Sequence, residues 1–420
     1  MTQEQAVRIP QQVANAIVGP KAYAEGTPVD EAFTWLRREA PLARLQPDGF
    51  NPFWAVTRHA DIRAIELRSD VFRNNDRPLS AVDAATERGM IAHALPIRTL
   101  MHMDSPDHMA YRRLTQSWFM PQNLRAMETR VREVAREFVD RMAATGGRCD
   151  FAQDVAFLYP LRIIMEVLGF PASDEPLMLR LTQELFGSSD PELGRTPDDP
   201  AFVSRSTIDD FVKYFNNVTE DRRTRPRADL ATEIANGEVG GRPIGHLEAM
   251  GYYFIVATAG HDTTSNSTAG GLWALCENPD QFRKLKSDPT LIQGFVDESI
   301  RWVSPVKHFM RTAAEDAEVA GQNIAEGDWL MLCYHSGNRD EAVFADPFKF
   351  DIERAPNKHL AFGYGPHVCL GQHLGRMEMR IFWEELLPRL KSIELDGEPR
   401  RTEANFVCGP KTVPVRFQMT

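Results

Sequence analysis

The chain has 420 residues, of which 43% are hydrophobic and 25% are charged, and its formal net charge at pH 7 is −11. This apolar content suffices for a large folded core and argues against a disordered chain. The acidic excess argues against nucleic acid or an anionic membrane surface as the partner. We recognise neither a signal peptide nor a membrane anchor, and five widely spaced cysteines predict no disulfide framework, so we expect a cytoplasmic protein.

The spacing of apolar residues predicts mostly helices in the first half of the chain. Clusters of Pro, Asp and Ser between these helices indicate loops. The predicted elements are, in chain order, a helix over 29–45, a strand and a helix over 51–67, a loop with short helices over 77–105, helices over 106–144 and 151–169, a helix near 174–186, a loop over 187–204 and a helix near 205–223.

The second half is predicted to contain one long helix over 246–277, which would span roughly 45 Å at a rise of 1.5 Å per residue. Strands follow over 312–333, then a helix from 372 toward 388 and short strands over 392–420. No linker and no internal repeat divides the chain. We therefore expect a single domain over 1–420, mainly α with a minor β portion, whose helical bulk covers about 106–310.

One cysteine, Cys369, stands in a glycine-rich turn over 362–371, directly before the predicted helix. The free N–H groups and the positive dipole end of a helix N-terminus stabilise a thiolate. A thiolate without a second cysteine nearby cannot complete a zinc or iron–sulfur site, but it can be the single protein ligand of a haem iron. The alternative is a structural cysteine in an ordinary helix-capping turn.

The middle of the predicted long helix carries an acid and two hydroxyl residues, Asp262, Thr263 and Thr264. Burying an acid inside an apolar helix is costly without a purpose. Gly260 weakens the helix and Thr263 can bond back to an upstream carbonyl, so we expect a kink that opens a groove. A helix N-cap or a solvated polar patch is the alternative interpretation. His261 is interpreted as a packing or surface residue.

Glu298 and Arg301 are three residues apart and therefore share a helix face. The same spacing occurs elsewhere in the chain, but here it has an apolar flank that includes Phe295, Val296 and Ile300. This flank favours a buried pair. An exposed salt bridge, which would contribute little to stability, is the alternative.

The segment around Cys369 resembles the haem-binding loop of the cytochrome P-450 superfamily, whose pattern is Phe-Gly-x-Gly-x-His/Arg-x-Cys-x-Gly. Every position of that pattern is met here. The resemblance implies haem b, iron protoporphyrin IX, with the Cys369 thiolate as axial ligand and with Phe362 and Gly363 in the binding loop. It also implies that the haem lies between the long central helix and the helix after the cysteine loop.

Further motifs of the same family follow in its order along the chain. Asp262 and Thr263 match the acid–alcohol pair that delivers protons to iron-bound dioxygen. Glu298 and Arg301 match a structural pair that a later arginine, resembled by Arg354, joins to hold the region leading into the cysteine loop.

The resemblance also implies cationic partners for the haem carboxylates, since buried propionates need paired donors. The residues at the matching positions are His108, Arg112, Arg311 and His367. Each of them could instead be an ordinary solvated residue. The substrate pocket would be lined by Ala259, Val306 and Phe309 and roofed by the 77–105 loop and a lid over 174–223.

At finer grain the chain resembles the soluble bacterial class that takes electrons from a separate iron–sulfur ferredoxin and a flavoprotein reductase, ultimately from NAD(P)H. Several stretches resemble the α-terpineol monooxygenase group. The implied activity is insertion of one oxygen atom from O2 into a C–H bond of a compact apolar substrate, a monocyclic monoterpene or an alkyl-aromatic. The implied protein is a monomer without nucleic-acid or membrane partners. The alternatives are a peroxide-dependent haem-thiolate peroxygenase and a haem-binding sensor without turnover.

Overall fold

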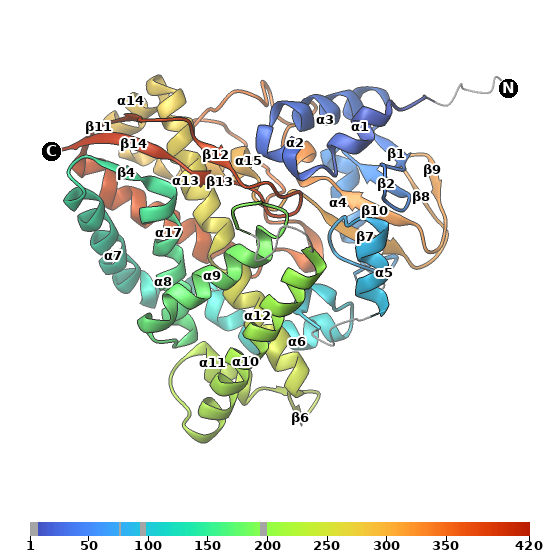
Figure 1. The fold of residues 1–420 in the computed structure, drawn as a ribbon, viewed down its shortest axis with the longest axis horizontal. Helices are drawn as coiled ribbons and strands as arrows, with labels where there is room; N and C mark the ends of the chain where they lie inside the picture. Colours follow the sequence, from blue (N-terminus) through green and yellow to red (C-terminus); the bar gives the residue numbers. More distant parts are fainter. Residues whose placement is uncertain (1–6, 75–76, 93–97, 194–199) are drawn as a thin grey trace.

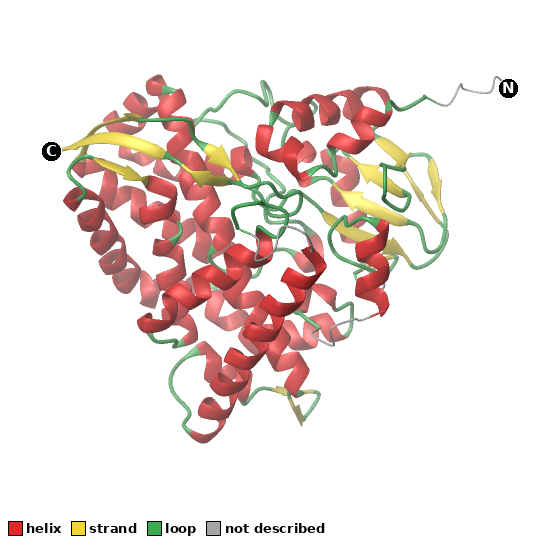
Figure 2. Cartoon of the chain, viewed as in Figure 1, coloured by secondary structure: helices red, strands yellow, loops and turns green. Residues whose placement is uncertain are grey.

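The computed structural model describes residues 7–74, 77–92, 98–193 and 200–420. Helices dominate and a smaller β portion lies at the periphery (Figure 2). The largest sheet lies beside the N-terminal helices at one side of the molecule, and the helical bulk fills the other side (Figure 1). The predicted class, mainly α with a minor β portion, is therefore confirmed. The assignment of residues 1–420 to one domain stays a prediction.

The helices fall into two groups along the chain. The helices before the central pair are α1 (Gln11–Ala16), α2 (Pro20–Glu25), α3 (Thr27–Glu39), α4 (His59–Leu67), α5 (Ala84–Ala92), α6 (Asp107–Gln116), α7 (Pro121–Ala144), α8 (Leu158–Leu168), α9 (Glu175–Phe186), α10 (Pro200–Thr224) and α11 (Leu230–Ala235). The central and later helices are α12 (His246–Ala259), α13 (Asp262–Glu277), α14 (Pro279–Ser287), α15 (Ile292–Val303), α16 (Tyr334–Gly337) and α17 (Gln372–Leu386).

Two predicted boundaries were wrong, and a proline explains each of them. The helix predicted over 29–45 ends at Glu39, because the residue before Pro41 is driven out of the helical region, and residues 42–45 form a strand instead. The loop predicted over 187–204 ends earlier, because Pro200 is the first residue of α10. Proline suits the first helical turn, where its missing N–H has no intrahelical partner.

The strands form one larger sheet and several small ones. The five-stranded sheet has the order β1 (Leu42–Leu45), β2 (Phe53–Val56), β10 (Trp329–Leu332), β7 (Phe309–Ala313) and β3 (Phe72–Arg73). The three-stranded sheet has the order β11 (Leu390–Leu395), β14 (Pro414–Met419) and β4 (Arg148–Asp150). Two-stranded sheets join β12 (Arg400–Arg401) to β13 (Pro410–Thr412), β5 (Glu238–Val239) to β6 (Arg242–Pro243), and β8 (Ala317–Val319) to β9 (Gln322–Ile324).

The main core lies where α7, α8, α13, α15 and α17 pack together. Phe295 of α15 meets Trp383 of α17 edge-to-face with ring centroids 4.8 Å apart, and both side chains are fully buried. Burying large rings in such pairs contributes strongly to stability. This packing fixes α17, and therefore the loop before it, against α15.

The predicted single helix over 246–277 is two helices, because α12 ends at Ala259 and α13 begins at Asp262. His261 leaves the helical conformation, with φ −122° and ψ −45°. The imidazole Nδ1 of this buried histidine lies 3.0 Å from the Ala257 carbonyl oxygen, and the Thr263 hydroxyl donates to the Ala259 carbonyl at 3.2 Å. Side chains therefore satisfy acceptors at the break. The expected kink is confirmed, although it is a full interruption.

Gly260→Ala should destabilise the protein at this break. An added Cβ would lie 2.4 Å from the Val256 carbonyl oxygen and 2.6 Å from Ile164, so neighbouring atoms must move. We expect a loss of about 1–3 kcal/mol in the free energy of unfolding, measured by urea denaturation. Gly89→Ala in α5 is the matched control, because its Cβ meets no atom within 4 Å and should be neutral or stabilising. If Gly260→Ala and Gly89→Ala change the free energy of unfolding equally, the close packing around Gly260 does not limit stability.

Candidate active site

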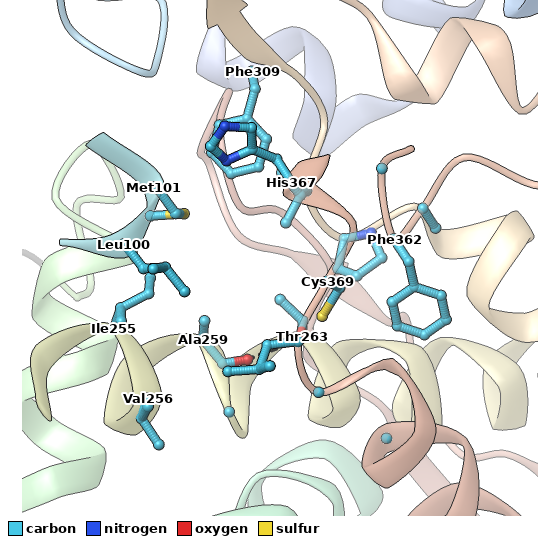
Figure 3. Close-up of a pocket in the computed structure, with 18 of the residues that line it drawn as sticks. Leu100, Met101, Ile255, Val256, Ala259, Thr263, Phe309, Phe362, His367 and Cys369 are labelled. Carbon is cyan, nitrogen blue, oxygen red and sulfur yellow. Dashed lines mark hydrogen bonds between the residues drawn. The ribbon is translucent and has the colours of Figure 1, made fainter. Parts of the chain in front are cut away.

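A mostly apolar cavity lies between α12–α13 and the loop that precedes α17. The residues that line it and are labelled in Figure 3 are Leu100, Met101, Ile255, Val256, Ala259, Thr263, Phe309, Phe362, His367 and Cys369. The sulfur of Cys369 points across the cavity toward the junction of α12 and α13, where Ala259 and Thr263 lie (Figure 3). The structure thus brings the predicted thiol, hydroxyl and pocket residues together, and Val306 also lines the cavity.

The cysteine loop holds the Cys369 thiol at the start of α17. The main-chain N–H of Cys369 donates to the Phe362 carbonyl at 2.8 Å, and this hydrogen bond closes the loop. The side chain faces the cavity, yet the surrounding protein desolvates it and raises its pKa. The N–H groups of Gly371 and Gln372 and the guanidinium of Arg112 act in the opposite direction. The loop therefore supplies the donors that a thiolate needs.

The donor set fits a haem. Among the described residues no group of three or more His, Cys, Asp or Glu side chains could hold a metal ion by itself. A single thiol that faces an apolar cavity suits a metal whose remaining equatorial ligands come from a porphyrin. The wall beside the thiol is open, because a Cβ added at Gly371 would meet no protein atom within 4 Å.

The four predicted propionate partners do not form one symmetrical cluster. The rings of His108 and His367 lie 3.9 Å apart, and burial lowers the pKa of both. Arg112 donates to the Val368 carbonyl at 2.8 Å, beside the cysteine. Arg311 lies on β7 and also lines the cavity. The two histidines are therefore neutral hydrogen-bonding groups at neutral pH, whereas the two arginines carry charge.

Sequence reasoning missed three polar residues beside these groups. The Glu66 carboxyl lies 3.6 Å from the Arg311 guanidinium and accepts from the Tyr334 hydroxyl at 2.6 Å. Asn74 contacts the His367 imidazole at 2.8 Å. Burial raises the pKa of Glu66 to about 7. Glu66 and Tyr334 are 268 residues apart in sequence, so no local pattern could have revealed their contact.

Asp262 and Thr263 differ in their relation to the cavity. Thr263 lines it, whereas Asp262 is buried, is not among the lining residues, and accepts from Asn266 Nδ2 at 3.3 Å. Burial raises the pKa of Asp262 to about 7, and the Asn266 hydrogen bond opposes the rise. An acid in this setting exchanges a proton near neutral pH.

The predicted Glu298 network is present and deeply buried. Arg301 donates to both Glu298 oxygens at 2.7 and 2.8 Å, and Arg354 Nε lies 3.2 Å from each of them. Asn357 and the Asp351 main-chain N–H supply further donors to the same carboxylate. The network therefore ties α15 to the segment that leads into the cysteine loop.

The lid predicted over 174–223 does not reach the cavity with any of its described side chains. The helix α10 instead packs on α9 and α12. Ile255 and Val256 of α12 line the cavity in place of lid residues. The 77–105 loop does contribute, through Leu79, Leu100 and Met101.

The family description Cytochrome P450 matches residues 84–417. The chain belongs to the cytochrome P450 family. Cytochrome P450-terp from a Pseudomonas species is 46% identical over 97% of this chain and 98% of its own. Linalool 8-monooxygenase from Pseudomonas putida is 34% identical over 94% and 97%. The crystal structure of CYP108D1 from Novosphingobium aromaticivorans has a TM-score of 0.90 and 42% identity, covering 98% of this chain and 99% of that one.

The family and its monooxygenase relatives make this P450 an oxidoreductase that incorporates oxygen from O2, with a haem-thiolate centre. The resemblance inferred from the sequence is confirmed. Within the described part of the chain, the helices are too short or too polar to cross a lipid bilayer.

Glu298→Gln should strongly destabilise this P450. The substitution leaves the buried charges of Arg301 and Arg354 without their carboxylate, which typically costs about 3–5 kcal/mol. Urea unfolding followed by circular dichroism measures the loss. Glu394→Gln is the matched control, because its pair with Arg416 is exposed and should contribute about 0–1 kcal/mol. Comparable losses in the two variants would refute the structural role of the network.

Asp262→Asn should stabilise the protein increasingly as pH rises from about 4 to about 7. The unfolded carboxyl ionises near pH 3.8, whereas the folded one stays protonated until about 7, so wild-type stability falls across this window. The gain over wild type should level off above pH 7, at about 4 kcal/mol at most. Urea unfolding at pH 5, 6 and 8 measures it.

Asp288→Asn is the control for this pH series. Hydrogen bonds from Thr290 lower the pKa of Asp288 below its unfolded value of 3.8, so the carboxyl is almost fully ionised at pH 5 in both the folded and the unfolded state. The difference from wild type should therefore stay constant between pH 5 and pH 8. A pH-independent difference for Asp262→Asn would show that this acid is already ionised in the folded protein.

Proposed function

We propose that this P450 binds haem b in the cavity between α13 and the cysteine loop, with the Cys369 thiolate as axial ligand. The observation that carries the proposal is the placement of Cys369 and Thr263 on opposite walls of one mostly apolar cavity. The haem supplies dioxygen activation when it is bound. The Phe362 and Gly363 segment closes the loop around it, and the Glu298–Arg301–Arg354 network keeps that loop in place.

Asp262 and Thr263 are the proposed proton-delivering pair. The Thr263 hydroxyl stands at the cavity wall beside the break between α12 and α13. Asp262 lies one residue before it, and its raised pKa lets the carboxyl hold a proton at neutral pH and release it. The break interrupts the main-chain ladder, and a hydroxyl next to such an interruption can exchange partners.

The propionates are assigned to the rim formed by His108, Arg112, Arg311 and His367. The arginines supply charge and the neutral histidines supply hydrogen bonds. Glu66 beside Arg311 belongs to the same rim, and its raised pKa lets it stay protonated beside an anionic group. A protonated carboxyl would donate a hydrogen bond there and add no like charge.

The proposed substrate is a small apolar molecule, a monocyclic monoterpene or an alkyl-aromatic of similar size. Ala259, Val306 and Phe309 line the cavity together with Leu79 and Ile255, and such a lining binds through apolar burial. The relatives named cytochrome P450-terp and linalool 8-monooxygenase support a terpene. The C–H bond held closest to the reacting centre would be hydroxylated.

Electrons are proposed to come from NAD(P)H through a flavoprotein reductase and an iron–sulfur ferredoxin, to a monomer in the cytoplasm. Exposed Arg113 on α6 is a candidate contact for an acidic ferredoxin. Arg376 is less suited, because it is half-buried and pairs with Asp297 at 2.7 Å. Arg113→Glu should slow reduction by the ferredoxin, since charge complementarity governs the association rate. An unchanged rate would exclude that contact.

The deciding experiment titrates the purified ferric protein with monoterpenes and alkyl-benzenes and then measures turnover. A compact apolar ligand should shift the haem band to shorter wavelength, and hydroxylated product should require ferredoxin, reductase and NAD(P)H. Product formed with peroxide alone would favour a peroxygenase, and binding without turnover a sensor. Cys369→Ser should abolish the thiolate spectrum, whereas Cys276→Ser, at a half-buried thiol that does not line the cavity, should not.

A further inference from the structure

One wall of the cavity is built where three distant segments meet. The segment 305–308 pairs with the segment 406–408 through a β-bridge between Val306 and Val407. Two main-chain hydrogen bonds flank this bridge. The Lys307 N–H donates to the Phe406 carbonyl at 2.8 Å, and the Cys408 N–H donates to the Pro305 carbonyl at 2.9 Å. The segment 79–81 lies against both. Its position decides how far Leu79, which lines the cavity, projects into the substrate space.

Two side chains hold the main chain of Ala81, one from each side. The Ala81 N–H donates to Nε2 of His308 at 2.8 Å. The Asn405 side-chain amide donates to the Ala81 carbonyl at 3.2 Å and to the Val18 carbonyl at 2.9 Å. We call His308 and Asn405 the Ala81 clamp. Two residues before Ala81, the Leu79 carbonyl accepts from the Met310 N–H at 2.9 Å.

The chemistry of the clamp requires a neutral His308. A main-chain N–H can only donate, so Nε2 must be an unprotonated acceptor and the ring proton sits on Nδ1. The ring is fully buried and packs edge-on against Phe406, with centroids 5.7 Å apart. Burial lowers the pKa of His308 to about 3, so the ring stays neutral across the physiological range.

His308 lines neither the cavity nor any part of the proposed haem site, but its neighbour Phe309 does. Phe309 packs against Phe406 with centroids 5.3 Å apart. His308 therefore adds a side-chain connection, besides the Met310 N–H, between the strand that carries Phe309 and the segment that carries Leu79. Ala81 and Leu79 are buried, so an N–H freed from His308 would have no water to bond and the segment would shift.

We propose that the Ala81 clamp sets the ligand size that the cavity accepts, by fixing Leu79 relative to Phe309. His308 and Asn405 act as positioning residues for the substrate. The inference rests on the proposed function, because it assigns the determinant of substrate size at that same site. It needs no particular substrate, since any ligand in the cavity meets Leu79 and Phe309.

The test compares His308→Leu with His308→Gln in the haem-loaded protein. Leucine removes the acceptor, whereas the glutamine side-chain oxygen can reach the place of Nε2. The probes are imidazole and 4-phenylimidazole, which ligate iron whatever the natural substrate is. In His308→Leu the ratio of their affinities should change by ~5-fold or more, which corresponds to a difference of about 1 kcal/mol between the two binding free energies. His308→Gln should stay close to wild type.

A second readout is amide hydrogen exchange in peptides that contain Ala81. The Ala81 amide should exchange faster in His308→Leu and remain protected in His308→Gln. Asn405→Asp, which replaces the donor by an oxygen at the same position, should change the affinity ratio as well and serves if His308→Leu does not fold. Folded variants with an unchanged ratio, or with both probes weakened equally, would overturn the clamp.

The two proposals fail in different ways. If no terpene binds, the imidazole ratio and the exchange of Ala81 still report on the clamp. If the purified protein holds no haem, the proposed function fails while the exchange experiment stands. If the wild-type protein binds a terpene and the affinity ratio of the two imidazoles is unchanged in His308→Leu, the clamp proposal is refuted and the proposed function stands.

Discussion

The site depends on keeping one thiolate beside an apolar cavity. The thiol of Cys369 is open to the cavity, yet desolvation by the surrounding protein raises its pKa, so the anion needs donors that offset the lost hydration. Those donors are N–H groups at the start of α17 and the Arg112 guanidinium, and both lie close enough only while the cysteine loop keeps its shape. The Glu298 carboxylate, which gathers Arg301 and Arg354, fixes the segment that leads into that loop.

The opposite wall, formed by α12 and α13, presents polar groups to the cavity and keeps its helical packing. A continuous helix would have satisfied every main-chain acceptor with main-chain donors and left none to rearrange. At the interruption, the side chains of His261 and Thr263 contact the carbonyl oxygens of Ala257 and Ala259. Rigidity at the thiolate and a local break facing it are therefore complementary features of one cavity.

Local patterns predicted the parts of the site that lie within one segment. The loop around Cys369, the acid and hydroxyl at 262–263 and the spacing of Glu298 and Arg301 are short-range features, and the structure places each of them near the cavity or the cysteine loop. Contacts across hundreds of residues were not predictable, as with Glu66. The described side chains of the predicted 174–223 lid do not line the cavity, and α10 instead packs on α12, whose Ile255 and Val256 do.

The polar and apolar parts of the cavity separate according to how charge can be tolerated. Along the rim that holds His108, Arg112 and His367, polar groups contact one another or the main chain. Each group offsets the desolvation cost of its neighbour, so removing one would leave another without a partner. Ala259, Val306 and Phe309 themselves present only apolar side chains to the cavity, so an apolar ligand that contacts them leaves no side-chain polar group of theirs unpaired. The apolar side chains of Ala259, Val306 and Phe309 therefore favour an apolar ligand, whereas the size of that ligand depends on what fixes Leu79 and Phe309.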